Sequence, residues 1–376
     1  MKVSFAVVLI LLISPLVLSF LLPDKEQDPA PEFDTELKAD APLHLYENGE
    51  YNFGRYAKPI VDPNIHKITK LQKKIQKKEW HFLSISTPHA LIGLAISQLN
   101  YAATSFIYVL TDDWTDQKQI MRPLGFGASF SESSVKGCSK WNDKIAKLVI
   151  EVCNFKDTIT VQAEGTLNDS NFIKVSAVID TNSDSLALAY PIGPHRVAYT
   201  LKQAGMPVRG YYKLKDRRYE FGEDAVAIQD WTRALPKRLT VWYWISINFV
   251  SKNKRIGVNL SHGMYPKRVG NQTLGLENGI WVDGNLHLVE SELIVDGEPG
   301  TGVLDEAEEW HCRTKDGSLK LTYRREGATV SGLDVKVLKG KLIHSYGTYS
   351  GVITIDGEKH VLKNVKGILE DHYTLW

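Results

Sequence analysis

Four Asp-Gly dipeptides in the second half of the chain constrain its fold more than any other feature. They lie at residues 283–284, 296–297, 316–317 and 356–357, each beside a run of alternating apolar residues. Asp-Gly readily adopts the positive φ angles that a tight β-hairpin needs, so each pair is expected to join two antiparallel strands. The second half of the chain is therefore expected to form an antiparallel β meander.

Short strand-like runs recur along the whole chain, whereas helical periodicity is scarce. These runs are residues 91–99, 105–110, 148–155, 159–167 and 172–179 in the first half, and 241–250, 255–260, 285–295, 319–323 and 352–355 in the second. The sequence has no glycine-rich loop of the P-loop or Rossmann type, which excludes those nucleotide-binding folds. We predict an all-β fold of barrel or sandwich type.

The chain divides into four segments. Residues 1–22 hold one Lys followed by a long apolar run, which is typical of a signal peptide or a membrane anchor. Residues 23–65 are rich in Pro, Asp and Glu and are predicted to be a linker. The remainder is too long for one small barrel, so we predict an N-terminal barrel over residues 66–215 and a C-terminal barrel over residues 216–376.

The flank of the apolar segment predicts the direction of export. Residues 24–40 contain seven acidic residues and two lysines, so Lys2 is expected on the cytosolic side and the folded body beyond the membrane. The body is therefore expected in the secretory pathway, in the endoplasmic reticulum lumen or outside the cell, and membrane-anchored if the segment is not cleaved. Three glycosylation sequons fit this location, at Asn168, Asn259 and Asn271, although Asn259 lies in a strand-like run.

Charge and cysteine content limit the possible partners. Lys and Arg number 45 against 44 Asp and Glu, so no nucleic-acid partner is expected. Of the three cysteines, Cys138 and Cys153 could form one disulfide, which would leave Cys312 free. The histidines are scattered without HxH or HExxH, and no CxxC occurs, so neither a metal site nor another cofactor is expected.

Residues 241–250 (VWYWISINFV) show the clearest strand pattern. Because side chains alternate across a strand, Val241 to Phe249 at odd positions form one apolar face, which is expected to be core. The other face carries Trp242, Trp244, Ser246 and Asn248. This face either lines a cavity for an apolar ligand inside a small barrel or is covered by a helix or by the other domain.

Two pairs, each of a carboxylate and a basic side chain, are candidates for catalysis or ligand binding. Asp230 and Arg233 lie three residues apart and could pair within a compact turn or contact a ligand. Glu370 and His372 point to the same side of a strand by its period of two, and this pair could serve acid–base chemistry or form a structural hydrogen bond.

The order of several motifs resembles the domain-of-unknown-function 2804 family from about residue 77 to residue 376. These motifs are EWHFLSI, ISQLNY, QDWTRALPKRLTVWYWIS, VNLSHG, LENGIWVDG, GTYSGVITIDG and GILEDHYTLW. More distantly, the layout is similar to tandem lipocalin-like proteins that include the carotenoid hydratases and AttH-type proteins. The resemblance implies two consecutive lipocalin-like antiparallel β-barrels and an apolar polyene or lipid as ligand.

The resemblance also marks individual positions. In the hydratase group an acid lies beside an aromatic residue, as Asp230 lies beside Trp231 here. The shared family positions are Arg233, Asn259, Glu277, Asn278, Trp281, Glu370 and His372.

These observations support three hypotheses. The first is binding or carriage of a hydrophobic small molecule or lipid, with Trp242, Trp244 and Trp281 as pocket walls. The second is an enzyme such as a hydratase or isomerase, with Asp230 or Glu277 as proton donor and His372 as partner. The third is a membrane-tethered scaffold whose barrels are packed solid. The candidate ligand-binding residues are Trp231, Arg233, Trp242, Trp244, Asn259, Asn278, Trp281 and Glu370.

Overall fold

The computed structural model describes residues 32–65, 76–193, 196–297, 299–300, 308–335 and 338–375. Within these ranges the regular elements are strands and no helix occurs, which confirms the all-β prediction. No helix of the described part is therefore long and apolar enough to cross a membrane. The segment of residues 1–22, predicted to be a signal peptide or anchor, lies outside the described residues.

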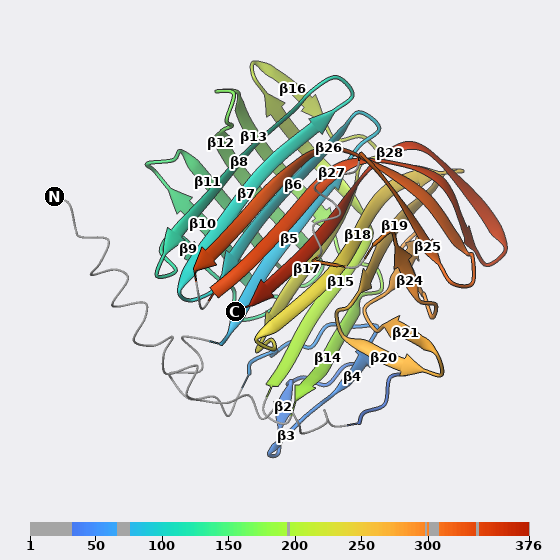
Figure 1. Cartoon of the computed structure of the whole chain (residues 1–376). Coiled ribbons are helices and arrows are strands. Elements are labelled where there is room, and N and C mark those ends of the chain that lie inside the picture. The colour runs from blue at the N-terminus through green and yellow to red at the C-terminus, as the bar shows by residue number, and fades with distance from the viewer. Residues whose placement is uncertain are drawn as a thin grey trace.

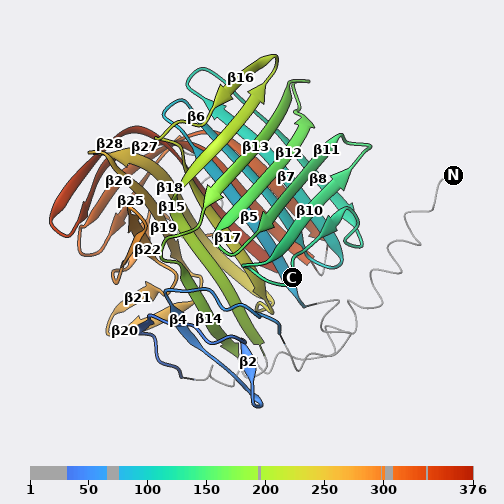
Figure 2. The same ribbon diagram turned by 180° about the vertical axis from the view of Figure 1, so that it is seen from behind.

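The first sheet is antiparallel along its main path and curls over itself (Figures 1 and 2). Its main path runs β8 (Thr115–Pro123), β7 (Ala102–Thr111), β6 (Ala90–Gln98), β5 (Lys78–Ser86), β17 (Val226–Ala234), β15 (Arg196–Leu214), β13 (Phe172–Asp180), β12 (Thr158–Thr166), β11 (Leu148–Asn154), β10 (Gly137–Asp143) and β9 (Ala128–Ser129). Attached to this path are β1 (Leu37–Lys38), β4 (Gly54–Tyr56), β14 (Leu186–Gly193) and β16 (Arg217–Glu220). Contacts of β6 with β9 and β10 close the curl, so the sheet forms a half-barrel.

The second sheet is built in the same antiparallel way. Its order is β23 (Asn285–Leu288), β22 (Gly279–Val282), β19 (Lys254–His262), β18 (Leu239–Ser251), β28 (Glu358–Leu375), β27 (Leu338–Ile355), β26 (Leu319–Val335), β25 (Glu309–Thr314) and β24 (Leu293–Val295). Two small hairpins lie beside the sheets, β2 (Tyr46–Glu47) with β3 (Glu50–Tyr51), and β20 (Pro266–Val269) with β21 (Gln272–Gly275).

Two of the four Asp-Gly dipeptides form the tight hairpin turns that the sequence predicts. Asp283-Gly284 joins β22 to β23 with φ angles of 48° and 88°, and Asp356-Gly357 joins β27 to β28 with φ angles of 48° and 81°. Positive φ at both central residues is the condition for the tightest hairpins. Asp316-Gly317 lies in a longer connection between β25 and β26, and the prediction is wrong for Asp296-Gly297, because β24 ends at Val295 and β25 begins only at Glu309. One predicted strand is wrong in extent, because residues 285–295 form two strands, β23 and β24, that lie at opposite edges of the sheet.

Strands β26, β27 and β28 are long and sharply bent, so that one half of each joins the second half-barrel and the other half lies over β6, β7 and β8 (Figure 1). The bend coincides with two register shifts and with the cross-strand neighbours Gly347 and Gly367. A Cβ atom on Gly347 would lie 2.0 Å from the carbonyl oxygen of Arg324. Glycine is therefore required there, because the strands approach too closely for any side chain.

Each half-barrel is filled by its own apolar core. In the second sheet Tyr243, Ile245, Ile247 and Phe249 belong to this core. The prediction for the odd-numbered face of residues 241–250 is therefore confirmed from Tyr243 to Phe249, whereas Val241 is only half-buried and lies outside this core. A separate aliphatic core fills the first half-barrel, from β5 and β6 across to β11, β12 and β13.

The even-numbered face of β18 meets the first sheet, so the two alternatives for that face can be decided. Trp242 and Trp244 share an apolar cluster with Phe82, Tyr108 and Ile228 of the first sheet. They do not line the interior of a small barrel, because β18 turns its odd-numbered side chains toward that interior and its even-numbered ones away from it.

The chain crosses from the first sheet to the second between Ala234 and Leu239. The division predicted at residue 215 falls between β15 and β16, which pair within one sheet. Much of the segment predicted as a linker, residues 23–65, is packed onto the first sheet. There β4 pairs with β14, and Leu45 and Ile60 are fully buried.

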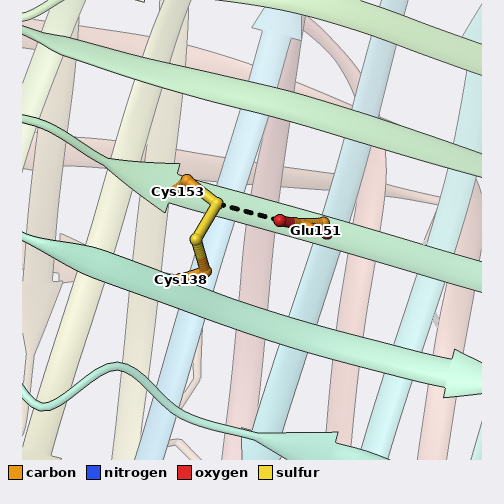
Figure 3. Close-up of side chains that lie close together, drawn as sticks. All are labelled: Cys138, Glu151 and Cys153. Carbon is orange, nitrogen blue, oxygen red and sulfur yellow. Dashed lines mark hydrogen bonds between the residues drawn. A yellow bond between two sulfur atoms is a disulfide. The ribbon is translucent and has the colours of Figure 1, made fainter.

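A disulfide joins Cys138 of β10 to Cys153 of β11, as the sequence had allowed (Figure 3). The remaining cysteine, Cys312, is a buried free thiol in the core of the second sheet.

The two sheets touch most closely where β15 crosses β19. A Cβ atom on Gly257 would lie 2.3 Å from the backbone nitrogen of Gly205 and 2.5 Å from the Cβ of Ala204. We expect Gly257→Ala to lower the free energy of unfolding by about 1–3 kcal/mol, because the sheets must separate to admit the methyl group. Thermal and urea unfolding will measure the loss. In the control Gly193→Ala the new Cβ meets no atom within 4 Å, and an equal loss in both variants would contradict the inferred contact.

Candidate functional site

Most of the sequence-predicted site residues lie between the two sheets, on two facing rows of side chains. In the first sheet the row runs across neighbouring strands through Lys202, Asp230 and Phe82. In the second sheet it runs through Trp244 and Glu370 to His344. Strand alternation places each of these side chains on the face that meets the other sheet.

Lys202, Asp230 and Glu277 form an ionic cluster in this interface, which we call the acid–lysine cluster. The Nζ of Lys202 lies 2.6 Å from Oδ2 of Asp230 and 3.4 Å from Oε2 of Glu277. Each of the three residues is at most 6 % exposed. Asp230 lies in the first sheet and Glu277 in the turn that precedes β22 of the second sheet, so the ammonium group of Lys202 links the two through charge.

Neighbouring donors fix the carboxylate of Asp230. Thr232 donates a hydrogen bond of 2.9 Å to Oδ1, and the indole of Trp80 donates one of 3.1 Å to Oδ2. Thr232 follows Asp230 by two residues on the same face of β17, whereas Trp80 comes from the adjacent strand β5. Charge-assisted bonds of this kind hold a carboxylate in one orientation.

Burial and charge act in opposite directions on the ionisable groups of the cluster. Burial alone would lower the pKa of Lys202, but the carboxylates of Asp230 and Glu277 outweigh it and raise that pKa above its ordinary value. Burial raises the pKa of Glu277, and the ammonium of Lys202 only partly offsets this. The cluster therefore holds a charged amine beside a carboxyl group that keeps its proton to higher pH than an exposed glutamate.

Two asparagines position Glu277. The side chain of Asn278 accepts a hydrogen bond of 2.6 Å from the backbone nitrogen of Ser261 and donates one of 3.1 Å to the carbonyl of the same residue. Asn259 donates from Nδ2 to the carbonyl of Glu277 at 2.8 Å and accepts from the indole of Trp244 at 2.9 Å. These hydrogen bonds hold the turn before β22 against β19.

Two buried polar atoms in this region lack a hydrogen-bond partner among the described residues. They are the hydroxyl of Tyr265 and Oε2 of Glu277, although the latter has its ionic contact with Lys202. The charge of Glu277 acts on Tyr265, and burial raises the pKa of that phenol well above its ordinary value. The phenol of Tyr265 therefore stays neutral at physiological pH and is buried near the acid–lysine cluster.

A second polar group, the carboxylate–imidazole cluster, consists of Glu370, His344, Tyr108 and Trp242. Glu370 accepts a hydrogen bond of 3.2 Å from the indole of Trp242 and contacts Nδ1 of His344 at 2.5 Å. The Nε2 atom of His344 lies 3.2 Å from the hydroxyl of Tyr108, which belongs to the first sheet. With a carboxylate at Nδ1, the proton is assigned to that nitrogen, so Nε2 accepts a hydrogen bond from the hydroxyl of Tyr108.

His372 lies in a stack of rings and not in an acid–base pair with Glu370. Its ring packs on Trp242 with centroids 3.5 Å apart and planes 8° apart, and the ring of Trp80 lies 6.3 Å from Trp242. Burial lowers the pKa of His372 to about 3, so its ring is neutral at physiological pH. The prediction that Glu370 and His372 share one face of a strand is confirmed.

Arg233 and Trp231 point away from this interface to the other face of β17, where Trp231 packs with Leu45 and Ile60 of the N-terminal segment. Arg233 donates to Glu79 at 2.7 Å and to the carbonyl of Ser131 at 2.9 Å, while Trp231 donates to the hydroxyl of Ser131. Asp230 and Arg233 therefore do not pair, because the segment is a strand that places them on opposite faces and not a compact turn.

Trp281 connects the sheets at a different point. Its indole donates 2.8 Å to the carbonyl of Asp184 in the loop before β14, and its ring is fully buried. Thus Trp242, Trp244 and Trp281 all lie in the contact between the sheets.

The three sequons differ in accessibility. Asn168 and Asn271 are exposed in turns, whereas Asn259 is fully buried. Its amide group is bonded to Trp244 and to the backbone of Glu277. Asn259 cannot carry a glycan in the folded protein, so this candidate is wrong.

Sequence reasoning missed Lys202, His344 and Tyr108. Lys202 had a recognisable signal, since it is a single charge within the apolar run VAYTLKQAG, and lysines are almost never buried unless they are paired. His344 and Tyr108 had none, because their contact joins residues 236 positions apart.

Two surface clefts lie apart from these clusters. One of about 620 Å³ is bordered by Thr35, Glu36, Leu37, Arg55, Lys267, Leu288 and Glu290. The other, of about 90 Å³, borders Asn154, Gln203 and Gln229 among others. None of the tryptophans proposed as pocket walls lines either cleft.

Replacing the central cation tests the acid–lysine cluster. We expect Lys202→Met to destabilise the protein by about 3–5 kcal/mol, because two buried carboxyl groups lose their compensating charge. Chemical unfolding will measure this. The control Lys174→Met removes a surface partner of Glu164 and should change stability by no more than about 0.5 kcal/mol. A similar small effect in both variants would show that Lys202 does not hold the cluster together.

The raised pKa of Glu277 predicts a pH dependence of stability. The folded protein keeps this proton at pH values where the unfolded chain, with an ordinary pKa of 4.5, has lost it. Stability from this group therefore falls as pH rises above 4.5 toward the folded pKa. Glu277→Gln removes the effect, so its melting temperature should rise relative to the wild type across that interval. Glu309→Gln, at an exposed position, is the control, and a difference that does not vary with pH would contradict the assignment.

Comparisons with known proteins agree with the motif-based resemblance. A search of curated protein sequences finds no match. Similar solved structures include kievitone hydratase from Nectria haematococca, at 8 % identity and a TM-score of 0.43 over 85 % of this chain and 96 % of that one. They also include CghA, at 11 % identity and a TM-score of 0.41 over 85 % and 92 %. A putative AttH from Nitrosomonas europaea has 10 % identity and a TM-score of 0.39 over 83 % and 98 %.

The likeness to these structures is distant, and no functional argument rests on it. The sequence comparison is more extensive, because a family model described as "Domain of unknown function (DUF2804)" matches residues 34–376. That range includes both sheets and every residue of the two polar clusters, so the chain belongs to the DUF2804 family.

Proposed function

We propose that this protein binds a mainly apolar small molecule between its two sheets and catalyses proton transfer on it. Glu277 is the proton donor, and His344, oriented by Glu370, is the base. Lys202 and Asp230 set the charge around the donor.

The observation that carries the proposal is the state of Glu277. Its carboxyl group is buried, and burial raises its pKa even though the ammonium of Lys202 lies 3.4 Å from Oε2. Burying such a group costs free energy that an apolar side chain would not. Catalytic acids require a raised pKa of this kind, because they must hold a proton near neutral pH and then release it.

The surroundings of the two clusters indicate the substrate class. Phe82, Phe106 and Trp244 pack around His344, and Lys202 lies 5.6 Å from the ring of Trp244. Among the side chains of the two clusters Lys202 is the single residue with a permanent positive charge, against the carboxyl groups of Asp230, Glu277 and Glu370. A neutral, unsaturated molecule is therefore favoured over a fatty acid, since an anion would be repelled there.

Ligand entry requires local movement of aromatic rings. Trp242 packs against the rings of both Trp80 and His372. A molecule that reaches Glu370 must displace one of these rings, so binding should change tryptophan fluorescence.

The compartment belongs to the same proposal. We place the folded body in the secretory pathway, on the strength of the apolar segment at residues 1–22. The disulfide between Cys138 and Cys153 supports an oxidising compartment.

All-trans-retinol, a neutral polyene alcohol, is the probe for this function, and retinoic acid is the matched anion. We expect retinol to quench tryptophan fluorescence of the full chain more tightly than retinoic acid does. In deuterated water, recovered retinol should gain deuterium on carbon, because proton donation and removal exchange hydrogen with solvent. Glu277→Gln should bind retinol equally and exchange about 10²–10⁴-fold more slowly.

The outcomes separate the hypotheses. Binding without exchange in the wild type indicates a carrier and contradicts the catalytic role of Glu277. Absence of binding to either probe supports a packed scaffold and contradicts the proposal as a whole.

A further inference from the structure

A second group of chemically reactive side chains lies on the outer face of the first half-barrel. It is separate from the two polar clusters between the sheets. Cys138 on β10 and Cys153 on β11 are directly opposite each other in the strand pairing (Figure 3). Glu151 precedes Cys153 by two residues, so its side chain lies on the same face of the strand. That face is the outer one, because the alternating residues Ile150 and Val152 belong to the core.

The carboxylate of Glu151 lies next to the disulfide, so the three side chains would be neighbours if the S–S bond were broken. The carboxylate Oε1 of Glu151 lies 3.2 Å from Sγ of Cys153, the contact drawn as a dashed line in Figure 3. A disulfide sulfur carries no proton, so this contact is not a hydrogen bond in the oxidised protein. One ligand atom from each of Cys138, Glu151 and Cys153 lies within 4.8 Å of the others.

The strand ladder should hold this arrangement when the disulfide is broken. Strands β10 and β11 pair from Gly137 with Asn154 to Asp143 with Leu148. Trp141, Ile150 and Val152 are fully buried beneath the ladder. The backbone positions of the cysteines are therefore fixed by pairing and packing and do not depend on the disulfide.

We propose that reduction of the Cys138–Cys153 disulfide creates a divalent metal site of the zinc type. Its ligands are the two thiolates and the carboxylate of Glu151, with water in the fourth position. Two soft sulfur donors and one carboxylate form a ligand set that suits Zn²⁺.

The chemistry balances with an external dithiol as reductant. The dithiol transfers two electrons and two protons to the disulfide and becomes a disulfide itself, while Cys138 and Cys153 become thiols. Zn²⁺ then forms two Zn–S bonds and releases those two protons to solvent. The Glu151 carboxylate binds without losing a proton.

The geometry requires only small side-chain movements. At Zn–S distances of about 2.3 Å, tetrahedral coordination places two sulfurs about 3.8 Å apart. Sulfurs on directly opposed residues reach this separation by side-chain rotation after the S–S bond breaks. The carboxylate oxygen of Glu151 is already in contact with one of them.

Charge favours the metal once the thiols are free. Lys140 pairs with Glu151 at 3.0 Å, but both side chains are largely exposed. Such surface pairs contribute little free energy, so Lys140 is readily displaced. A divalent cation neutralises two thiolates and a carboxylate far better than one mobile ammonium group does.

Cobalt(II) is the probe, since its thiolate complexes are coloured when tetrahedral. The full chain is reduced with a phosphine, and the phosphine is removed before anaerobic titration. We expect sulfur-to-cobalt charge-transfer bands and visible ligand-field bands at one cobalt per chain, which zinc abolishes. The oxidised chain should give neither.

Variants locate the site. Glu151→Gln should bind cobalt at least about tenfold more weakly, whereas Glu164→Gln, a matched change at another exposed, lysine-paired glutamate of the same half-barrel, should bind normally. The double substitution Cys138→Ser and Cys153→Ser should abolish the cobalt bands. Cys312 should not substitute, because burial in the core of the second sheet raises the pKa of its thiol.

Three results would overturn the proposal. The first is a reduced wild type without cobalt bands. The second is equal binding by Glu151→Gln and Glu164→Gln. The third is loss of the far-ultraviolet β signal on reduction, because the site requires an intact strand ladder. None of these outcomes bears on the interface between the sheets, so the proposed function is tested separately.

Discussion

The ammonium group of Lys202 allows the facing surfaces of the two sheets to pack with polar groups between them. Asp230 comes from the first sheet and Glu277 from the turn that precedes β22 of the second, and both are buried within 3.4 Å of the same nitrogen. Two carboxyl groups brought together without this cation would repel each other or force uptake of protons. The close contact at Gly205 and Gly257 sets how near the strands around Lys202 can approach.

Strand register decides which residues belong to the interface. In β17, Asp230 and Thr232 face the second sheet, whereas Trp231 and Arg233 lie on the opposite face, where Arg233 binds Glu79. A shift of one residue would exchange the two sets completely. Pairing of β17 with both β5 and β15 therefore determines the chemistry of the interface as well as the stability of the sheet.

Local sequence signals were enough for the fold class but not for the partners of the site. Asp-Gly turns and alternation act over a few residues, so hairpins and the core face of residues 241–250 could be predicted. The partner of the opposite face, with Trp242 and Trp244, depends on how two sheets stack, and no local pattern encodes this. For the same reason the contact between His344 and Tyr108 had no signal. Lys202 was detectable in principle, because an isolated lysine in an apolar strand needs a buried counterion.

Metal-site motifs fail on this fold for a related physical reason. Patterns such as CxxC describe donors that a single turn brings together, whereas Cys138 and Cys153 meet by pairing of two strands, and alternation along one strand adds Glu151. The position of a donor set then determines what can reach it. The acid–lysine cluster is sealed between sheets, where burial raises the pKa of Glu277. The cysteine pair and Glu151 lie on an outer face of the first half-barrel, where Cys138 and Glu151 are partly exposed and Cys153 is buried.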